Sequence, residues 1–90
     1  MILHVGNLPF SLEEKDLRAF FEIYGVVNNI VIIKDRITNI SKGYGFVDMN
    51  SSQEANMSID RLNNKLVLDQ FITVQTAENQ TWTHFQNKKQ

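Results

Sequence analysis

The chain contains the octapeptide Lys42-Gly43-Tyr44-Gly45-Phe46-Val47-Asp48-Met49, in a sequence of 90 residues. Its alternating aromatic and small residues are typical of a β-strand. Successive strand side chains point to opposite faces, so Tyr44 and Phe46 emerge on one face, and Val47 and Met49 on the other. Two aromatic rings on an open sheet, preceded by a lysine, form a platform on which unstacked bases can lie.

Strand-like segments also lie on both sides of this octapeptide. They are rich in β-branched and other apolar residues, which is typical of strands in a partly buried sheet. The sequence predicts strands at residues 2–6, 26–34, 43–49 and 71–77, with a short extra strand at 66–68.

Two capping boxes predict where helices begin. Ser11 would cap the first helix, with Glu14 three residues later, and Ser51 would cap the second, with Glu54 three residues later. Each predicted helix carries one apolar stripe with the spacing i, i+4 and i+7. The stripes are Leu17, Phe21 and Tyr24 in the first helix, and Ala55, Ile59 and Leu62 in the second. The helices are expected to end near Tyr24 and Asn63.

The resulting order, β-α-β-β-α-β, predicts an α+β protein of the ferredoxin-like class. Because each helix has one apolar stripe, both are expected on one face of a four-stranded antiparallel sheet, leaving the other face open. The expected domain is residues 1–78. Residues 79–90 would form a tail, either a short helix or disordered.

Strand alternation predicts which side chains lie on the open face. The core-facing set is Leu3, Val5, Ile30, Ile32, Ile72 and Val74, and the open set is Ile2, His4, Gly6, Val31, Ile33, Tyr44, Phe46, Asp48, Phe71, Thr73 and Gln75. Because this face is so apolar, we expect it to be covered at least part of the time.

The octapeptide resembles the octamer motif of the RNA recognition motif family, Lys/Arg-Gly-Phe/Tyr-Gly/Ala-Phe-Val-x-Phe/Tyr. Only Met49 departs from it. Residues 3–8, Leu-His-Val-Gly-Asn-Leu, resemble the family's hexamer motif, with His4 where Phe or Tyr is usual. The resemblance covers about residues 2–77. The chain also resembles the small stand-alone members found in bacteria, and a fragment of a larger eukaryotic protein is the alternative.

The resemblance implies a non-catalytic protein that binds single-stranded RNA across the sheet. It implies that Tyr44, Phe46 and His4 stack on bases, that Lys42 and Arg36 contact phosphates, and that Gln75 and Asn7 hydrogen-bond base edges. If His4 titrates near 6.5, affinity should rise slightly in mild acid. Asp48 is either an acceptor for a base amine or a solvated strand residue. Asp69-Gln70 stands where the family often has Gly-Arg.

The net charge of −1 is unusual for a protein that binds nucleic acid. Residues 13–22 hold four acidic and two basic side chains, whereas residues 34–42 hold three basic and one acidic. We expect these segments on different sides of the fold, with few phosphate contacts and a shallow dependence of affinity on salt.

Other classes of protein have little support in the sequence. There is no cysteine, and two distant histidines do not suggest a metal site. No nucleophile, base and acid form a credible catalytic set, so neither an enzyme nor a cofactor is expected. No apolar run approaches the roughly 20 residues of a membrane span, and no signal peptide is evident, which favours the cytoplasm.

A protein-interaction module with the same fold is the main alternative. It would bind its partner through the helices or through the C-terminal tail. Trp82 and Phe85, three residues apart, would share one side of a helix in that tail. The tail could instead cover the sheet or stay disordered. Dependence of RNA binding on both Tyr44 and Phe46 would distinguish the two hypotheses.

Overall fold

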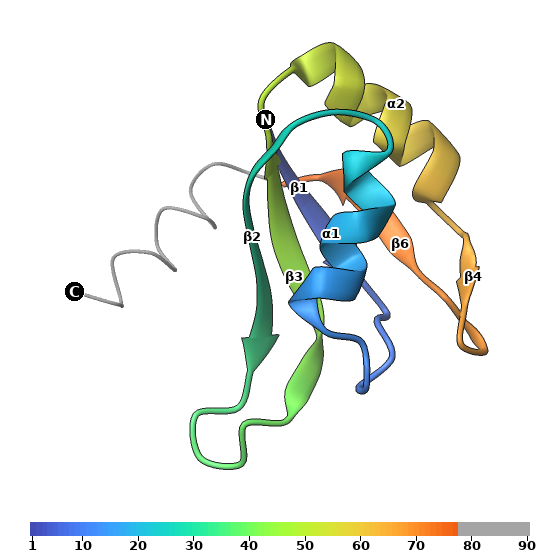
Figure 1. The fold of residues 1–90 in the computed structure, drawn as a ribbon. Coiled ribbons are helices and arrows are strands. Elements are labelled where there is room, and N and C mark those ends of the chain that lie inside the picture. The colour runs from blue at the N-terminus through green and yellow to red at the C-terminus, as the bar shows by residue number, and fades with distance from the viewer. Residues whose placement is uncertain (78–90) are drawn as a thin grey trace.

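The computed structural model describes residues 1–77. Its elements are β1 (Ile2–Gly6), α1 (Glu14–Glu22), β2 (Val27–Lys34), β3 (Ser41–Met49), α2 (Ser52–Leu62), β4 (Leu66–Val67), β5 (Gln70–Phe71) and β6 (Thr73–Thr76) (Figure 1). The predicted β-α-β-β-α-β order is confirmed, with the small β4–β5 hairpin inserted before the last strand. The proposed boundary at residue 78 and the tail, with Trp82 and Phe85, lie outside the described residues.

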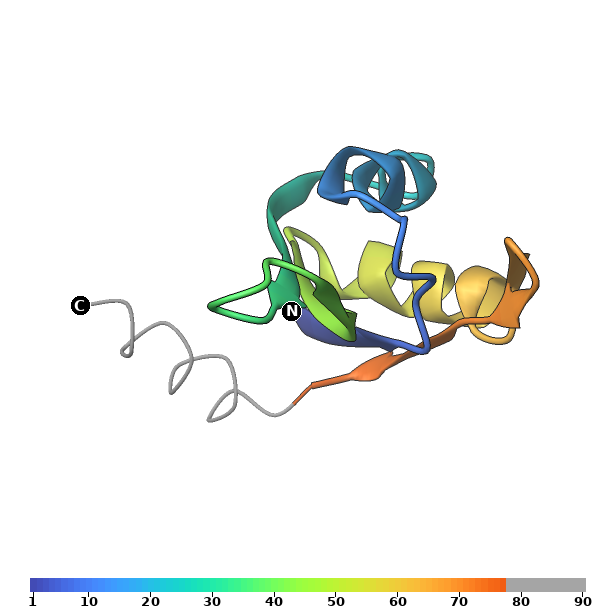
Figure 2. The ribbon, with the colours of Figure 1, turned by 90° about the horizontal axis from the view of Figure 1, so that it is seen from below.

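Four strands form an antiparallel sheet in the order β2-β3-β1-β6. Figure 2 shows α1 and α2 together on one side of this sheet, and neither of these two helices covers the opposite face. The ferredoxin-like α+β fold is therefore confirmed. The two middle strands, β1 and β3, are the strands on which the sequence predicts the aromatic side chains.

The hydrophobic core lies between the helices and the sheet. Helix α1 buries Leu17 and Phe21 completely, and α2 buries Ala55 and Leu62. Each large apolar side chain buried in this way contributes roughly 1.5–3 kcal/mol. The sheet side of the core is formed by Leu3, Val5, Ile32, Val47, Met49, Ile72 and Val74. Except for Ile30, which is only partly buried, the predicted core-facing residues are confirmed.

The predicted start of the first helix is wrong. Helix α1 begins at Glu14, with Glu13 rather than Ser11 at the cap position. The Glu13 N–H donates to Oδ2 of Asp16 at 3.0 Å. The Glu14 carboxylate instead accepts a hydrogen bond from the Ile32 N–H, at 2.8 Å. A residue expected to cap the helix therefore joins the helix to β2, and the helix ends two residues earlier than expected.

The predicted cap of the second helix is confirmed. The Ser51 hydroxyl accepts a hydrogen bond from the Glu54 N–H at 3.3 Å. At the other end, the side-chain oxygen of Asn63 accepts from the Val74 N–H at 2.9 Å. This bond joins the end of α2 to β6.

The β4–β5 hairpin changes the place of Phe71. Leu68 and Asp69, between the two short strands, have φ angles of 47° and 72°. Two consecutive positive φ angles are typical of a tight two-residue hairpin turn. Phe71 pairs with Leu66 in this hairpin, so it does not belong to the main sheet, and 59% of it is exposed. The prediction that Phe71 lies on the open face is therefore wrong, because the hairpin shortens the last sheet strand to Thr73–Thr76.

Candidate nucleic-acid interface

Three aromatic side chains meet on the open face, and we call them the ring cluster: His4, Tyr44 and Phe46. His4 lies directly across from Phe46 in the β1–β3 pairing. The His4 and Tyr44 rings are stacked, with centroids 5.6 Å apart and planes 23° apart. Phe46 lies edge-on to both, at 5.5 Å from His4 and 6.2 Å from Tyr44. The sheet thus brings together the three rings that the sequence predicts.

The two positions of the octapeptide that hold glycine require it for different structural reasons. A side chain at Gly45 would overlap the carbonyl oxygen of Val31 on the neighbouring strand. Gly43 has a φ of +86°, which favours glycine. The Gly43 carbonyl accepts a hydrogen bond from the Leu8 N–H at 2.8 Å, and this bond holds the β1–α1 loop against β3.

The exposure of the open face differs from the alternation expected from sequence. His4 and Tyr44 are half-buried, but only 3% of Phe46 is exposed. Ile33, predicted to point outward, is also buried, and the β2–β3 register is irregular between Ile32 and Lys34. An irregular register breaks the strict alternation of sides along a strand. The cluster therefore offers mainly His4 and Tyr44 to a ligand in this arrangement.

The register places one row of side chains across the whole sheet. Val31 lies across from Phe46, Phe46 from His4, and His4 from Gln75. Gln75 is exposed, as predicted, and lies beside the ring cluster. Polar and aromatic groups thus share one row. A base stacked on His4 would lie close to a side-chain amide.

Asp48 has a partner in the structure. Its carboxylate lies 3.5 Å from the amino group of Met1, which also donates to the Met49 carbonyl at 2.9 Å. Neither of the two roles considered from sequence included this ion pair. The pairing offsets the negative charge that Asp48 would present to phosphate.

Burial lowers the pKa of His4 below its ordinary value of 6.5. Its Nδ1 atom is buried and has no hydrogen-bond partner within residues 1–77. The imidazole is therefore uncharged at neutral pH. The condition for the expected rise in affinity, titration of His4 near 6.5, is not met, because desolvation moves this titration to lower pH.

The lowered pKa of His4 predicts a pH-dependent loss of stability. Below about pH 6.5 the unfolded chain binds a proton at His4 that the folded chain still excludes. The free energy of unfolding should be highest above this pH and fall as the pH drops toward the folded pKa. Urea unfolding of wild type and of His4→Phe measures this free energy. Between about pH 7.5 and about pH 5.5, wild type should lose stability relative to the variant. A difference that is constant with pH would contradict the prediction.

A hollow of about 520 Å³ adjoins the ring cluster at one end of the open face. It brings the predicted residues Asn7 and Lys42 next to His4 and Tyr44. Its lining consists of His4, Gly6, Asn7, Leu8, Phe10, Lys42, Gly43, Tyr44, Gln70 and Thr73.

Phe10 and Gln70 are lining residues of this hollow that sequence reasoning missed as contact residues. Phe10 is a loop residue with no periodic pattern around it, and the only signal was an aromatic residue directly after Pro9. Gln70 was considered only as a departure from the family pattern. Asn7, by contrast, was predicted, but its amide already donates to the Phe71 carbonyl at 2.9 Å.

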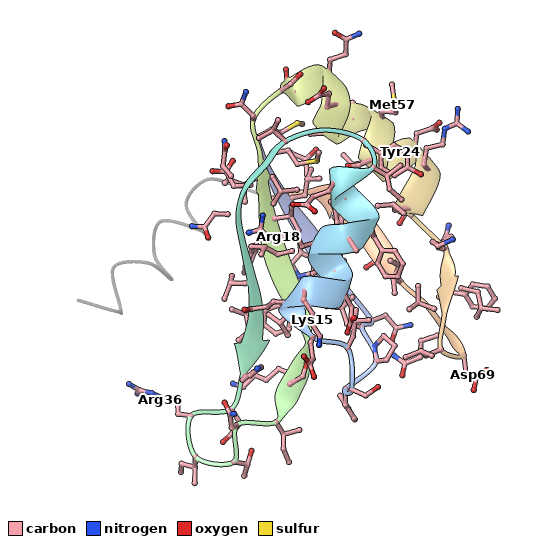
Figure 3. All side chains as sticks on the ribbon, viewed as in Figure 1. Lys15, Arg18, Tyr24, Arg36, Met57 and Asp69 are labelled. Carbon is pink, nitrogen blue, oxygen red and sulfur yellow. The ribbon has the colours of Figure 1, made fainter. Side chains whose placement is uncertain are left out.

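Arg36 lies apart from the hollow, on the loop between β2 and β3. Figure 3 shows its side chain directed outward from this loop, and it is not among the lining residues. The loop is ordered by Asp35, whose Oδ1 accepts from the N–H groups of Thr38 at 3.0 Å and Ile37 at 2.9 Å. These bonds lower the pKa of Asp35. Arg36 thus lies on an ordered loop at one end of the sheet, away from the hollow.

Acidic and basic segments lie on different parts of the fold, as expected. The acidic residues 13–22 include α1, on the helical side, and the basic residues 34–42 include the β2–β3 loop (Figures 1 and 3). Within residues 1–77, no three His, Cys, Asp or Glu side chains gather as a metal site. No helix in the same range is both long and apolar enough to cross a membrane.

Comparison with known proteins identifies relatives of this chain. The family model for the RNA recognition motif matches residues 3–73. "Probable RNA-binding protein 23" of Homo sapiens is 44% identical over 63 residues, which are 70% of this chain and 14% of that protein. The "33 kDa ribonucleoprotein, chloroplastic" of Nicotiana sylvestris is 46% identical over 57 residues, 63% of this chain and 18% of that protein. The chain thus spans less than a fifth of either relative.

Solved structures of RNA-binding proteins have the same fold as this chain. "RNA Binding Protein PG1" has a TM-score of 0.83 and 34% identity, over 86% of this chain and 93% of that chain. The Sex-lethal protein in its complex with RNA has a TM-score of 0.83 and 32% identity, over 86% of this chain and 46% of that chain. Because the family model covers most of the chain, the chain belongs to the RNA recognition motif family.

Proposed function

We propose that this domain is a non-catalytic module that binds single-stranded RNA on the open face of its sheet. The observation that carries the proposal is the ring cluster on the two middle strands. Family membership supports it, and so does the similarity to the Sex-lethal domains, whose structure is a protein–RNA complex.

The geometry of the cluster favours unpaired bases. Side chains reach the flat faces of bases only when those bases are unstacked, as in single strands, loops and bulges. Tyr44 and His4 would stack on bases, and Phe46 would do so where its face becomes accessible. Gln75 and the remaining oxygen of the Asn7 amide would hydrogen-bond base edges.

Within residues 1–77, few cations lie near the proposed interface. Lys42 at the hollow and Arg36 on the β2–β3 loop are the cations that we propose for phosphate contacts. Two contacts on a single strand give a salt slope of roughly −1.4, since each contributes about −0.7. Stacking should therefore supply most of the affinity.

A fluorescence-anisotropy titration with a short random-sequence RNA tests the proposal. The single strand should bind more tightly than a duplex of the same length, and the log–log slope against salt should be roughly −1.4. Lys42→Gln and Arg36→Gln should each make this slope shallower by about 0.7.

Lys15→Gln is the matched control for these charge changes. Lys15 is exposed on α1, on the helical side (Figure 3), and should leave the slope unchanged. If Lys15→Gln changed the salt slope as much as Lys42→Gln and Arg36→Gln do, the phosphate contacts would not lie at Lys42 and Arg36. A wild type that binds neither form of RNA would contradict the proposed function.

A protein partner is the second candidate, and one surface favours it. A groove of about 370 Å³ lies between α1 and the β4–β5 hairpin. Beside it, 56% of Leu66 and 65% of Leu68 are exposed. Substitution of Leu66 and Leu68 by serine should leave RNA binding intact if the open face is the RNA site. The predicted partner surface on residues 79–90 lies outside the described part of the chain.

A further inference from the structure

The hollow beside the ring cluster has two aromatic borders. Tyr44 and His4 form one border, and Phe10, from the β1–α1 loop, forms another. Phe10 is 71% exposed, and its Cε1 lies 3.8 Å from the position of a β-carbon on Gly43. An exposed aromatic ring beside a hollow of nucleotide size suits a planar ligand.

Two side-chain amides in the hollow have fixed orientations. The amide nitrogen of Asn7 donates to the Phe71 carbonyl at 2.9 Å. The amide nitrogen of Gln70 donates to the Asn7 carbonyl at 3.0 Å. Each amide thus turns its nitrogen to the backbone, and neither side-chain oxygen has a hydrogen-bond partner within residues 1–77. Because both residues line the hollow, it offers two side-chain acceptors to a ligand, beside the second N–H of each amide.

Acceptors recognise base edges that carry N–H groups. Guanine presents its N1–H and its N2 amino group side by side, whereas uracil presents one N–H between two carbonyl oxygens. Adenine and cytosine present one amino group beside an acceptor nitrogen. Two acceptors therefore match guanine best. Lys42, also in the lining, lies where it can contact a phosphate of the same strand.

We propose that this hollow is a subsite for one further nucleotide of single-stranded RNA, with its base against Phe10 and its donor edge, preferably that of guanine, on Asn7 and Gln70. The proposal rests on the proposed function, because the subsite extends the strand bound on the ring cluster. It assigns a contact role to Phe10 and Gln70.

Anisotropy titrations test the subsite with octauridine and with octamers in which one guanosine replaces each uridine in turn. Wild type should prefer at least one guanosine octamer. Phe10→Ala should weaken that octamer by at least fivefold, the lower end of roughly 5- to 150-fold for one stacking side chain. Gln70→Met should remove the preference for guanosine, so that the guanosine octamers bind no more tightly than octauridine.

Ile37→Ala is the control, because Ile37 is 93% exposed on the β2–β3 loop and does not line the hollow. Thermal melts should match wild type for Phe10→Ala, since that side chain is exposed. Two results would overturn the subsite: Phe10→Ala binds the guanosine octamer as tightly as wild type, or wild type shows no preference for guanosine. If Tyr44→Ala still weakens octauridine binding in either case, the proposed function stands. No binding of any octamer by wild type would overturn both.

Discussion

Replacing Tyr44 by alanine together with Phe46 by leucine should weaken binding of a short single-stranded RNA by roughly 30- to 1,000-fold. Each stacking ring contributes about 1–3 kcal/mol. The two substitutions together should remove about 2–4 kcal/mol, less than the full sum, because Phe46 is only 3% exposed and leucine keeps an apolar side chain there. Leucine at position 46 is chosen because only 3% of Phe46 is exposed. Truncating a buried phenylalanine to alanine costs about 3–5 kcal/mol of stability and would confuse unfolding with lost binding.

Phe71→Ala is the matched control for this double variant. It also removes an aromatic side chain, 59% exposed, but from the β4–β5 hairpin rather than from the ring cluster. Its RNA affinity should equal that of wild type, and circular dichroism should show all variants folded. If the double variant binds RNA as tightly as wild type, the RNA-binding site does not lie on the open face. In that case the groove between α1 and the hairpin becomes the next surface to test.

Among the single substitutions proposed for testing, Gly45→Ala should lower the stability of the domain most. Its new methyl group would overlap the Val31 carbonyl oxygen and lie 3.1 Å from the Ile32 Cα. Both are backbone atoms of β2, so relief requires the two strands to move apart. Overpacking of this kind costs about 3 kcal/mol, which lowers Tm by roughly 12–24 °C in a domain of this size.

Gly6→Ala separates this clash from the general effect of adding a methyl group to the sheet. At Gly6 the nearest atom to the new methyl group is the side-chain hydroxyl of Thr73, at 2.7 Å, and a side chain can rotate away. The loss should be below about 1 kcal/mol. Thermal unfolding followed by circular dichroism measures both variants. Equal losses at the two positions would show that the backbone contact with Val31 is not the cause.

Local patterns predicted most of the fold. Alternation along β1 and β3 was enough to predict that His4, Tyr44 and Phe46 share a face, because the side-chain period of a strand does not depend on distant residues. The cap at Ser51 was predictable for the same reason, since a capping box involves residues only three apart. The cap at Ser11 was not. There the Glu14 carboxylate bonds to the backbone of β2, which lies 18 residues further along the chain.

The amino-acid sequence was enough to predict the order of the elements, the two strands that carry the rings, and the face on which those rings lie. The middle position of these strands, the exposure of each ring, the place of Phe71 in the β4–β5 hairpin and the lining of the hollow all depend on tertiary contacts. Gln70 contacts Asn7 across 63 positions of the chain. Such a contact depends on the strand order β2-β3-β1-β6 and on the hairpin before β6, and no local period encodes it. The pKa of His4 also depends on burial by neighbours that the sequence alone does not place.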